Sequence, residues 1–458
     1  MNQLLQSVRG RIIRPEDSGY ESARRVYNFA IDRRPLLIVE CADVADVIHC
    51  VNYARDHKIP LAVRGGGHSA PGFGTCDGGI VADLARLKGI RIDPENRIAR
   101  VEGGATWGDL DHATHVFGLA APGGVISTTG VGGLTTGGGF GYLSRRYGLA
   151  CDNLISVDIV TADGRLRVAN DSENADLFWA IRGGGGNFGI VTSFEFRLHP
   201  VDQVYAGPIL YPLEKSAEVL RLFRDFMRTA PREISTFFAF LIVPPGPPFP
   251  EELHGQTVCA IMCACTDLAR AEEIVRPLRQ FGPPLLVLTH PMPYPFLNSL
   301  FDGLLPHGLH HHWRADFVHD LTEEAIAVHT RFGPRIPTIH SALHIYPLDG
   351  AIQDVGSDDT AFAYRDVRFV HVIAAVTPDP EQLPQQREWV RDYWSALHPH
   401  SAGGSYVNFL MEEGEERVAS SYAGNHRRLA EVKAKYDPAN VFCVNQNIRP
   451  ALAQSRTF

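Results

Sequence analysis

The sequence predicts an α+β protein of at least two domains. Its 458 residues are enough for two or more units that each bury a core. Between residues 78 and 200 most of the chain consists of short β-like segments separated by turns. Beyond Val201 glycine becomes less frequent, and amphipathic helical segments alternate with apolar strand-like ones. We therefore expect a first domain of strands and turns, and a second in which helices flank an antiparallel sheet.

A strand, a helix and a second strand are predicted before the first glycine cluster. The helix is ADVADVIHCVNYARDHK (42–58), in which apolar residues from Val44 to Ala54 recur at helical spacing. Strands flank it in PLLIVEC (35–41) and IPLAVR (59–64). Further strand-like segments follow at 78–85, 90–103, 154–169 and 188–200, with hairpin-type breaks at DPEN and ADG.

The second half of the chain predicts one antiparallel sheet with helices. Amphipathic spacing favours helices at 216–231 and 266–282. The expected strands are 235–243, 257–265, 285–290, 310–318, 339–348 and 366–377. Near Tyr406 the pattern changes again, and the tail at 426–450 is expected to fold back on the first domain. We place the domains at 1–203, 204–403 and 404–458, the last returning to the first.

Composition excludes several classes of protein. A formal charge of −9 argues against a nucleic-acid partner, because phosphate binding needs a basic face. No apolar run reaches the roughly 18 residues of a membrane span, and the opening residues lack the apolar core of a secretory signal. The eight cysteines are scattered, unlike a disulfide framework, and Cys259, Cys263 and Cys265 are typical of core packing. We expect a cytoplasmic protein.

Three glycine clusters point to an extended cofactor. They are RGGGHS (64–69), GVGGLTTGGGFG (130–141) and GGGGNFGIV (183–191). Consecutive glycines let backbone N–H groups converge on an anion such as a diphosphate. A Rossmann dinucleotide loop needs a strand before it and a helix after it, whereas here Pro122-Gly123-Gly124 precedes the second cluster. A nicotinamide-linked dehydrogenase is therefore disfavoured.

Several motifs in order resemble one known family. RGGGHS, Asp83-x-x-x-Leu87, EGGATWGDL (102–110), TGVGGLTTGGGFGYLSRRYGL (129–149) and DLFWAIRGGGGNFGIVT (176–192) resemble the berberine-bridge-enzyme-like branch of the vanillyl-alcohol-oxidase (PCMH-type) flavoproteins. Tyr406-Val-Asn408 and YDPANVFCVNQNI (436–448) are similar to its closing motifs. The resemblance implies a two-lobed PCMH-type FAD-binding domain and a substrate domain with an antiparallel sheet.

The resemblance also implies how FAD is held. The histidine after the first glycine turn, here His68, carries the flavin through its 8α-methyl carbon, and neutral imidazole is a suitable nucleophile near neutral pH. A second bond through cysteine is not expected, because Ile126 stands at that position. The expected cofactor-binding residues are Arg64, Gly65, Gly66, Gly67, His68, Ser69, Gly124, Thr128, Gly130, Gly133, Gly137, Gly189, Ile190, Val191, Asn408, Asn445 and Asn447.

Three residues are expected to take part in catalysis. Tyr406 matches the family's catalytic tyrosine, which acts as a base if a positive charge or a strong hydrogen bond favours its phenolate. His344 is the candidate for a second acid or base, with Tyr346 on the same face of its strand. Thr129 matches the position beside the flavin face where oxygen reacts, and its small side chain allows access.

The run His310-His311-His312 does not predict a metal site. On a strand only His310 and His312 share a face, and two ligands do not close such a site. A place in the substrate cavity and ordinary packing both stay open for these histidines.

The function expected from these observations is an FAD-dependent oxidase. It would transfer a hydride from a small-molecule alcohol, hemiacetal or natural product to the flavin, and O₂ would then yield hydrogen peroxide. With only Trp313, Trp389 and Trp394 available to stack on sugars in the middle of the chain, a hydrophobic secondary metabolite is favoured. The alternatives are a flavin oxygenase of polyketide or secondary metabolism and a flavin-binding protein without turnover.

Overall fold

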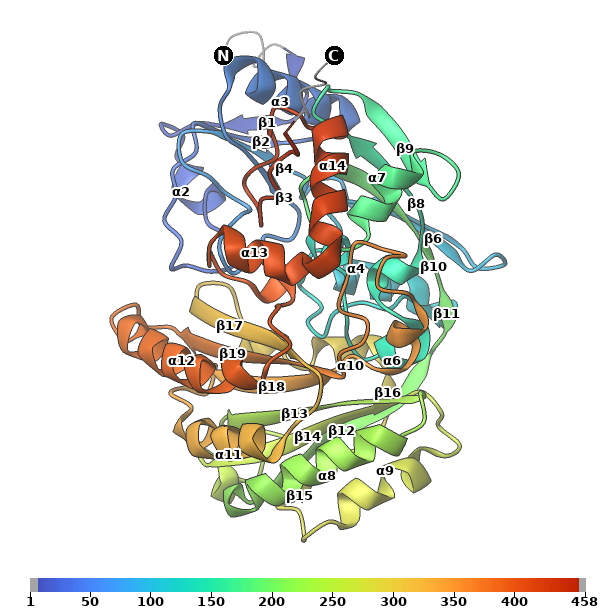
Figure 1. The fold of residues 1–458 in the computed structure, drawn as a ribbon, viewed down its shortest axis with the longest axis vertical. Helices are drawn as coiled ribbons and strands as arrows, with labels where there is room; N and C mark the ends of the chain where they lie inside the picture. Colours follow the sequence, from blue (N-terminus) through green and yellow to red (C-terminus); the bar gives the residue numbers. More distant parts are fainter. Residues whose placement is uncertain (1–6, 453–458) are drawn as a thin grey trace, which may run out of the picture.

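The computed structural model describes residues 7–452 and arranges them in two lobes (Figure 1). The first lobe holds two sheets and, with them, the last two helices of the chain. The second lobe holds one large sheet with helices against it. The α+β class predicted from the sequence is confirmed. No helix in the described part of the chain is both long and apolar enough to cross a membrane.

The first sheet carries the first glycine turn at its end. Its four strands are β1 (Arg11–Ile13), β2 (Leu37–Glu40), β3 (Leu61–Arg64) and β4 (Ile80–Asp83), in the order β1-β2-β4-β3. Strands β2, β4 and β3 are parallel, and α3 (Val44–His57) connects β2 with β3 as predicted. Asp43 caps α3 by accepting a hydrogen bond from the Asp46 N–H, which fixes where the helix begins. A short α2 (Tyr20–Ala23) precedes this unit.

The second sheet is antiparallel and carries the other two glycine turns. Its strands are β5 (Ile90–Asp93), β6 (Ile98–Glu102), β8 (Leu154–Val160), β9 (Leu166–Asn170) and β10 (Ile190–Arg197), in the order β5-β6-β10-β8-β9. Helices α4 (Trp107–His115) and α7 (Ala175–Ile181) contact its outer strands, and the short α5 (Val131–Thr136) and α6 (Ser144–Tyr147) follow α4 in the chain, with α6 in contact with the second lobe. A small pair, β7 (Leu119–Ala120) and β11 (His199–Pro200), closes the lobe. The second glycine cluster thus contains a helix of only six residues, unlike a Rossmann loop.

The large sheet has eight strands, which are antiparallel where they pair. Its strands are β12 (Gln203–Tyr211), β13 (Ile234–Ile242), β14 (Thr257–Cys265), β15 (Leu286–Val287), β16 (His290–Pro293), β17 (His310–Val318), β18 (Ala342–Pro347) and β19 (Phe369–Thr377). The order is β15-β12-β14-β13-β18-β19-β17, with β16 also on β12. Strand β12 was not predicted, because Gly207 and Pro208 interrupt its apolar pattern. The strand predicted at 285–290 is divided between β15 and β16.

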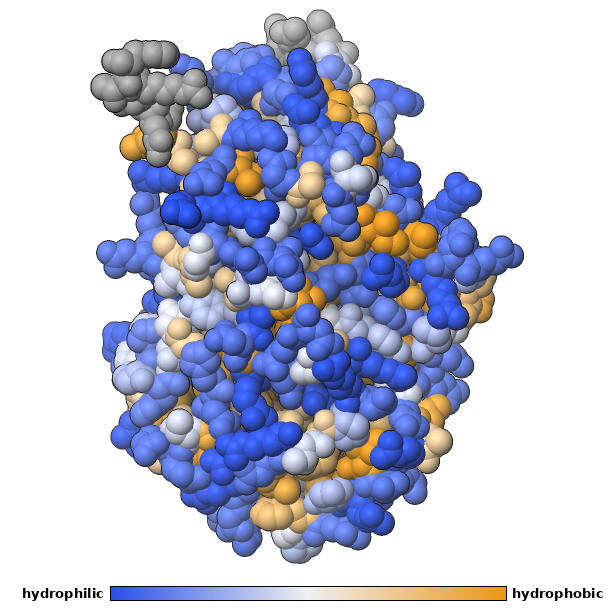
Figure 2. Space-filling model, turned by 45° about the vertical axis from the view of Figure 1, so that its right-hand side comes forward, coloured by the Kyte–Doolittle hydropathy of each residue, from blue (hydrophilic) through white to orange (hydrophobic). Residues whose placement is uncertain are grey.

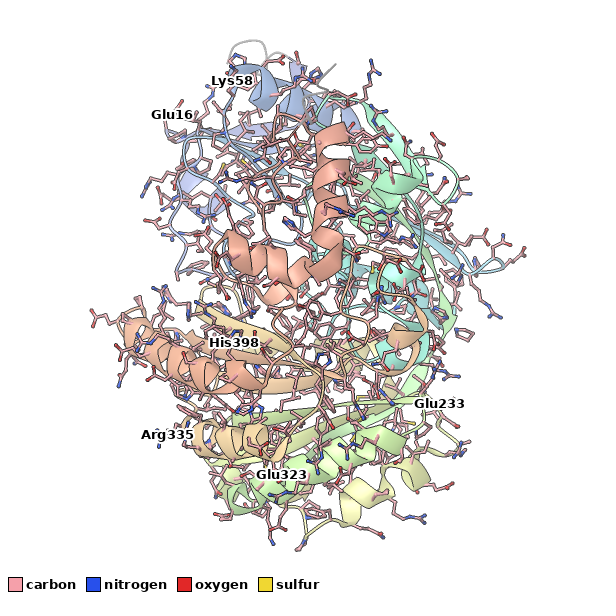
Figure 3. The ribbon with its side chains drawn as sticks, viewed as in Figure 1. Glu16, Lys58, Glu233, Glu323, Arg335 and His398 are labelled. Atoms are coloured by element: carbon pink, nitrogen blue, oxygen red, sulfur yellow. The ribbon has the colours of Figure 1, made fainter. Side chains whose placement is uncertain are left out.

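Four helices cover one face of this sheet and leave the other face for the first lobe. They are α8 (Ser216–Thr229), α9 (Ala271–Gln280), α11 (Glu323–Phe332) and α12 (Leu383–Leu397). Their apolar faces share one core with the sheet, and Cys259, Cys263 and Cys265 pack there as expected. Glu323, labelled in Figure 3, joins α11 to α8 through Arg221 and Arg224. Short α10 (Tyr294–Ser299) contacts α4 of the first lobe.

The tail of the chain packs against the first lobe. Helix α14 (His426–Tyr436) lies beside α7 in Figure 1, and α13 (Glu415–Tyr422) contacts α14. Val418, Tyr422 and Leu429 of these two helices belong to the core of the second sheet. The face drawn in Figure 2 is mostly polar with small apolar areas, as is ordinary for a globular surface. The domain limits at 203/204 and 403/404 stay a prediction.

Candidate functional site

A cavity of about 340 Å³ lies where the three glycine turns, the large sheet and the tail of the chain meet. The large sheet contributes Trp313 and Tyr346, and the tail contributes Tyr406, Asn408 and Asn445. Among the described residues that line the cavity, Arg64 is the only one with a charged side chain. Its guanidinium is already bound to Asp83 at 2.6 Å and to the carbonyl of Ala23 at 2.7 Å. The cavity therefore offers no free charge.

The first and second glycine turns touch backbone to backbone. A Cβ atom on Gly66 would lie 2.4 Å from the Gly130 nitrogen, and one on Gly130 would lie 2.4 Å from the Gly66 nitrogen. Neither turn can carry a side chain at this contact, because real Cβ atoms do not come so close to backbone atoms. The glycines thus let two loops from different sheets meet along one wall of the cavity.

His68 presents an unused ring nitrogen in this wall. Its ring stacks on Tyr27 with centroids 4.0 Å apart, and its Nδ1 lies 3.4 Å from the Thr129 hydroxyl. Its Nε2 is buried and has no hydrogen-bond partner among the described residues. Burial, reinforced by nearby His307, lowers the pKa of His68 to about 3. The imidazole is therefore neutral near pH 7, and one of its two ring nitrogens carries a lone pair.

Tyr406 is held by two N–H donors. Its phenol oxygen accepts hydrogen bonds from the Gly139 amide at 2.9 Å and from Asn408 Nδ2 at 2.8 Å. Burial raises the pKa of Tyr406, and these two bonds act in the opposite direction because they favour the phenolate. With both acceptor positions used, the O–H proton of Tyr406 is left to face another group.

His344 does not reach the cavity itself but contacts Tyr346, which does. Its Nδ1 lies 2.7 Å from the Tyr346 hydroxyl, as expected for two residues on one strand face. Tyr346 lines the cavity, whereas His344 does not. Burial lowers the pKa of His344 to about 4, so its ring is neutral near pH 7 and can accept the Tyr346 proton.

Most other residues predicted for the cofactor line the same cavity. These are Arg64, Gly65, Gly66, Gly67, Ser69, Gly124, Gly130, Gly133, Gly189, Ile190, Val191, Asn408 and Asn445, together with Thr129. Three do not. Thr128 is exposed, Gly137 packs beneath the Asn408 side chain, and Asn447 lines a neighbouring cavity of about 400 Å³. Of the three consecutive histidines none lines the main cavity, and His311 instead packs behind Tyr27.

Two residues that the sequence did not single out hold the third glycine turn to the tail. The Asn187 side chain donates to the carbonyls of Gly184 and Gln446 and accepts from the Ile448 N–H. Lys433 is fully buried, and its ammonium donates to the carbonyls of Asn187 and Phe442 and to Asp437 at 2.6 Å. Asn187 stands inside the third glycine cluster, whereas for Lys433 the only local signal was an aspartate four residues later. Tyr27, which stacks on His68, lies in no motif.

Comparison with known proteins gives the family. Residues 35–170 match the family described as "FAD binding domain", and residues 405–449 match "Berberine and berberine like". An FAD-linked oxidoreductase of Dictyostelium discoideum is 33% identical over 456 residues, which cover 98% of this chain and 97% of its own. The chain belongs to the berberine-bridge-enzyme-like family. It is an FAD-linked oxidoreductase.

Two further comparisons also cover nearly the whole of this chain. The (R)-6-hydroxynicotine oxidase of Paenarthrobacter nicotinovorans is 30% identical over 461 residues, 97% of both chains. The crystal structure of 6-hydroxy-D-nicotine oxidase from Arthrobacter nicotinovorans has a TM-score of 0.87 and 28% identity, covering 97% of this chain and 99% of that one. The predicted FAD cofactor is thereby supported, and the contact between Gly66 and Gly130 and the free Nε2 of His68 fit it.

Proposed function

We propose that this protein is an oxidase whose FAD is bound covalently to His68 and whose substrate is a neutral, hydrophobic small molecule. The observation that carries the proposal is one cavity without a free charge, lined both by His68, whose Nε2 has no partner among the described residues, and by Tyr406, with its two N–H donors. When bound there, FAD supplies a hydride acceptor that O₂ reoxidises with release of hydrogen peroxide.

His68 is suited to hold the flavin through its 8α-methyl carbon. Its ring is neutral, and the stack on Tyr27 together with the Thr129 contact at Nδ1 sets the orientation of Nε2. The place of a second link is taken by Ile126, which lines the cavity and cannot form a thioether. We therefore propose a single histidyl link.

Tyr406 is the proposed base for the substrate O–H or N–H proton. The N–H bonds from Gly139 and Asn408 both strengthen when the phenol oxygen gains charge, so they lower the cost of proton removal. Tyr346 is a second group at the substrate, with His344 ready to accept its proton. Thr129, beside His68, leaves room for O₂ with its small side chain.

The cavity walls favour an aromatic or polycyclic substrate. Tyr27, Phe140, Trp313, Tyr346 and Phe409 line it. A charged substrate would lose its hydration without gaining a free counter-ion, which is costly. The buried Trp313 Nε1–H has no partner among the described residues and would suit a carbonyl oxygen of the substrate. We propose that the protein is cytoplasmic and acts on a secondary metabolite and O₂, without nucleic-acid or membrane partners.

The first test needs only purified protein. We expect a flavin spectrum, and yellow colour that stays with the pellet after acid precipitation. His68→Ala should release the colour into the supernatant, whereas His307→Ala, which changes a neighbouring histidine, should keep it in the pellet. Colour released by acid from the wild type would contradict the covalent link. Candidate aromatic alcohols and amines would then be screened for anaerobic bleaching, followed by peroxide release in air; bleaching by no compound would favour a flavin-binding protein without turnover.

A flavin oxygenase is the second candidate. The FAD-dependent monooxygenase FUP4 of Fusarium proliferatum is 37% identical over 203 residues, which are 44% of this chain and 39% of that protein. Turnover under labelled O₂ separates the two. Label in the organic product would favour the oxygenase, and label in peroxide alone would favour the oxidase.

A further inference from the structure

The segment between α2 and β2 binds a free edge of the large sheet. Strand β17 is the last strand of that sheet, so on one side it has no neighbouring strand among the described residues. The Asn28 side chain occupies this side at His311, where Oδ1 accepts the His311 N–H at 2.9 Å and Nδ2 donates to the His311 carbonyl at 3.1 Å. The Phe29 N–H donates to the Leu309 carbonyl at 2.9 Å. The segment thus binds the second lobe much as a short strand would.

The same Asn28 side chain also binds the turn that carries His68. Its Nδ2 donates a second hydrogen bond, 2.6 Å long, to the carbonyl of Ala70, and its Oδ1 accepts another from the Ala30 N–H at 3.0 Å. An asparagine amide has two donor hydrogens and two acceptor positions, and all four are used here in a residue that is 1% exposed. Glutamine is longer, and an ionised aspartate cannot donate. This set of bonds is therefore specific for asparagine.

Tyr27, the preceding residue, extends this connection to the imidazole. Its N–H donates to the Gly67 carbonyl at 3.0 Å, its hydroxyl donates to the Leu305 carbonyl at 2.9 Å, and its ring stacks on His68. That stack is the closest ring contact of His68, whose Thr129 contact is long, at 3.4 Å, and whose Nε2 has no partner among the described residues. The His68 ring is thus held at a position that depends on the contact with β17.

We propose that Asn28 makes the covalent attachment of FAD depend on the docking of the second lobe, as the positioning residue that fixes Tyr27, and with it the His68 ring, against β17. The proposal rests on the histidyl link proposed above. In attachment, His68 loses its ring N–H proton and forms a bond to the 8α-methyl carbon, which loses one hydrogen as a proton and two electrons. O₂ takes up the two electrons and two protons and leaves as hydrogen peroxide.

The position of the His68 ring decides the rate of such a step. The reacting atoms have to lie about 3–3.5 Å apart, and a displacement of about 1 Å costs on the order of 100-fold in rate. Without its stack the His68 side chain would populate other rotamers. FAD that reaches a first lobe without its partner lobe would therefore bind and stay unattached. The bond would form once Trp313 and Tyr346 of the second lobe complete the cavity.

Asn28→Leu tests the proposal when bound flavin and attached flavin are measured separately. The visible spectrum of the purified holoenzyme gives the total bound flavin, and the flavin that stays with the pellet after acid precipitation gives the attached part. We expect the ratio of attached to bound flavin to be near one in the wild type and at least tenfold lower in Asn28→Leu. A loss of stability alone lowers the yield of folded protein and leaves this ratio unchanged.

A buried asparagine elsewhere in the first lobe gives the matched control. The Asn153 side chain is 2% exposed and donates to the carbonyls of Tyr147 and Leu149, and it does not line the cavity. Asn153→Leu should keep the wild-type ratio. An equal fall in Asn153→Leu and Asn28→Leu would overturn the proposal, because the loss of any buried amide would then suffice.

A second pair of variants tests the contact from the side of β17. His311→Ala and His311→Pro both remove the imidazole, but only His311→Pro also removes the N–H that Asn28 accepts. Proline is tolerated on an edge strand, because its missing N–H does not face a neighbouring strand. We expect a lower ratio of attached to bound flavin in His311→Pro than in His311→Ala, and equal ratios would overturn the proposal.

The wild type separates this inference from the proposed function. A wild-type ratio near one that is unchanged in Asn28→Leu would overturn the inference and leave the histidyl link intact. Release of all flavin from the wild type by acid would refute the link itself, and this inference with it. If Asn28→Leu does not fold, Asn28→Asp takes its place, because it keeps the size and the acceptor oxygen and loses the two donors; a wild-type ratio in Asn28→Asp would then overturn the inference.

Discussion

Asn408 Nδ2 donates a 2.8 Å hydrogen bond to the phenol oxygen of Tyr406, two residues before it in the chain. The same amide group also donates to the Leu134 carbonyl at 3.1 Å, which ties the tail to the helix after the second glycine turn. The proposed base and the glycine turn are thus held by one side chain.

Asn408→Ala should slow reduction of the flavin by roughly 10- to 100-fold. A hydrogen bond to a developing phenolate is worth about 1.5–3 kcal/mol, and each 1.4 kcal/mol is a factor of ten in rate. Stopped-flow reduction under anaerobic conditions measures the effect, and Tyr406→Phe should slow it further while keeping the colour. A wild-type rate in both variants would remove Tyr406 from the mechanism.

Gly66→Ala should abolish flavin binding. Its Cβ would lie 2.4 Å from the Gly130 nitrogen, so the two turns would have to separate. Gly424→Ala is the control, because no atom lies within 4 Å of its added Cβ. Flavin absorbance relative to protein absorbance reports the result; equal flavin content in both variants would show that the contact between the turns is dispensable.

Lys433→Met should destabilise the protein by about 3–5 kcal/mol, because it leaves the buried Asp437 carboxylate without its cationic partner. Lys435 is the comparison, since its pair with Asp176 is 59% and 37% exposed and is worth less than about 1 kcal/mol. Urea denaturation followed by tryptophan fluorescence measures both. Similar losses for Lys433→Met and Lys435→Met would argue against a special role of the buried pair.

Stability should fall as the pH is lowered from about 6.5 to about 4. Burial lowers the pKa of His344 and of His371 to about 4 from 6.5. Between these values the unfolded chain binds protons that the folded chain does not, so acid favours unfolding, and the loss is absent above pH 6.5. Melting temperatures across this range should fall less steeply for His344→Gln than for the wild type. Parallel curves would mean that His344 is protonated in the folded protein.

The sequence by itself predicted the glycine turns, most of the strands, and His68 and Tyr406 as residues of the site. These predictions depend on local patterns, and both residues line the cavity. Polyglycine beside an apolar run allows a tight backbone wherever the rest of the chain lies. Alternating apolar residues likewise predict a strand without its partner, and β12 was missed where Gly207 and Pro208 broke that alternation.

Tertiary structure alone decided which residues meet. Tyr27 stacks on His68, Lys433 binds the carbonyl of Asn187 across 246 positions, and Asn298 meets Asp111 across 187 positions. No local pattern marks such pairs, because they form only when two lobes and the tail of the chain are packed together. Burial away from water also shifts the pKa values of His68, His344 and Asp111 from the ordinary values that would be assumed from the sequence alone.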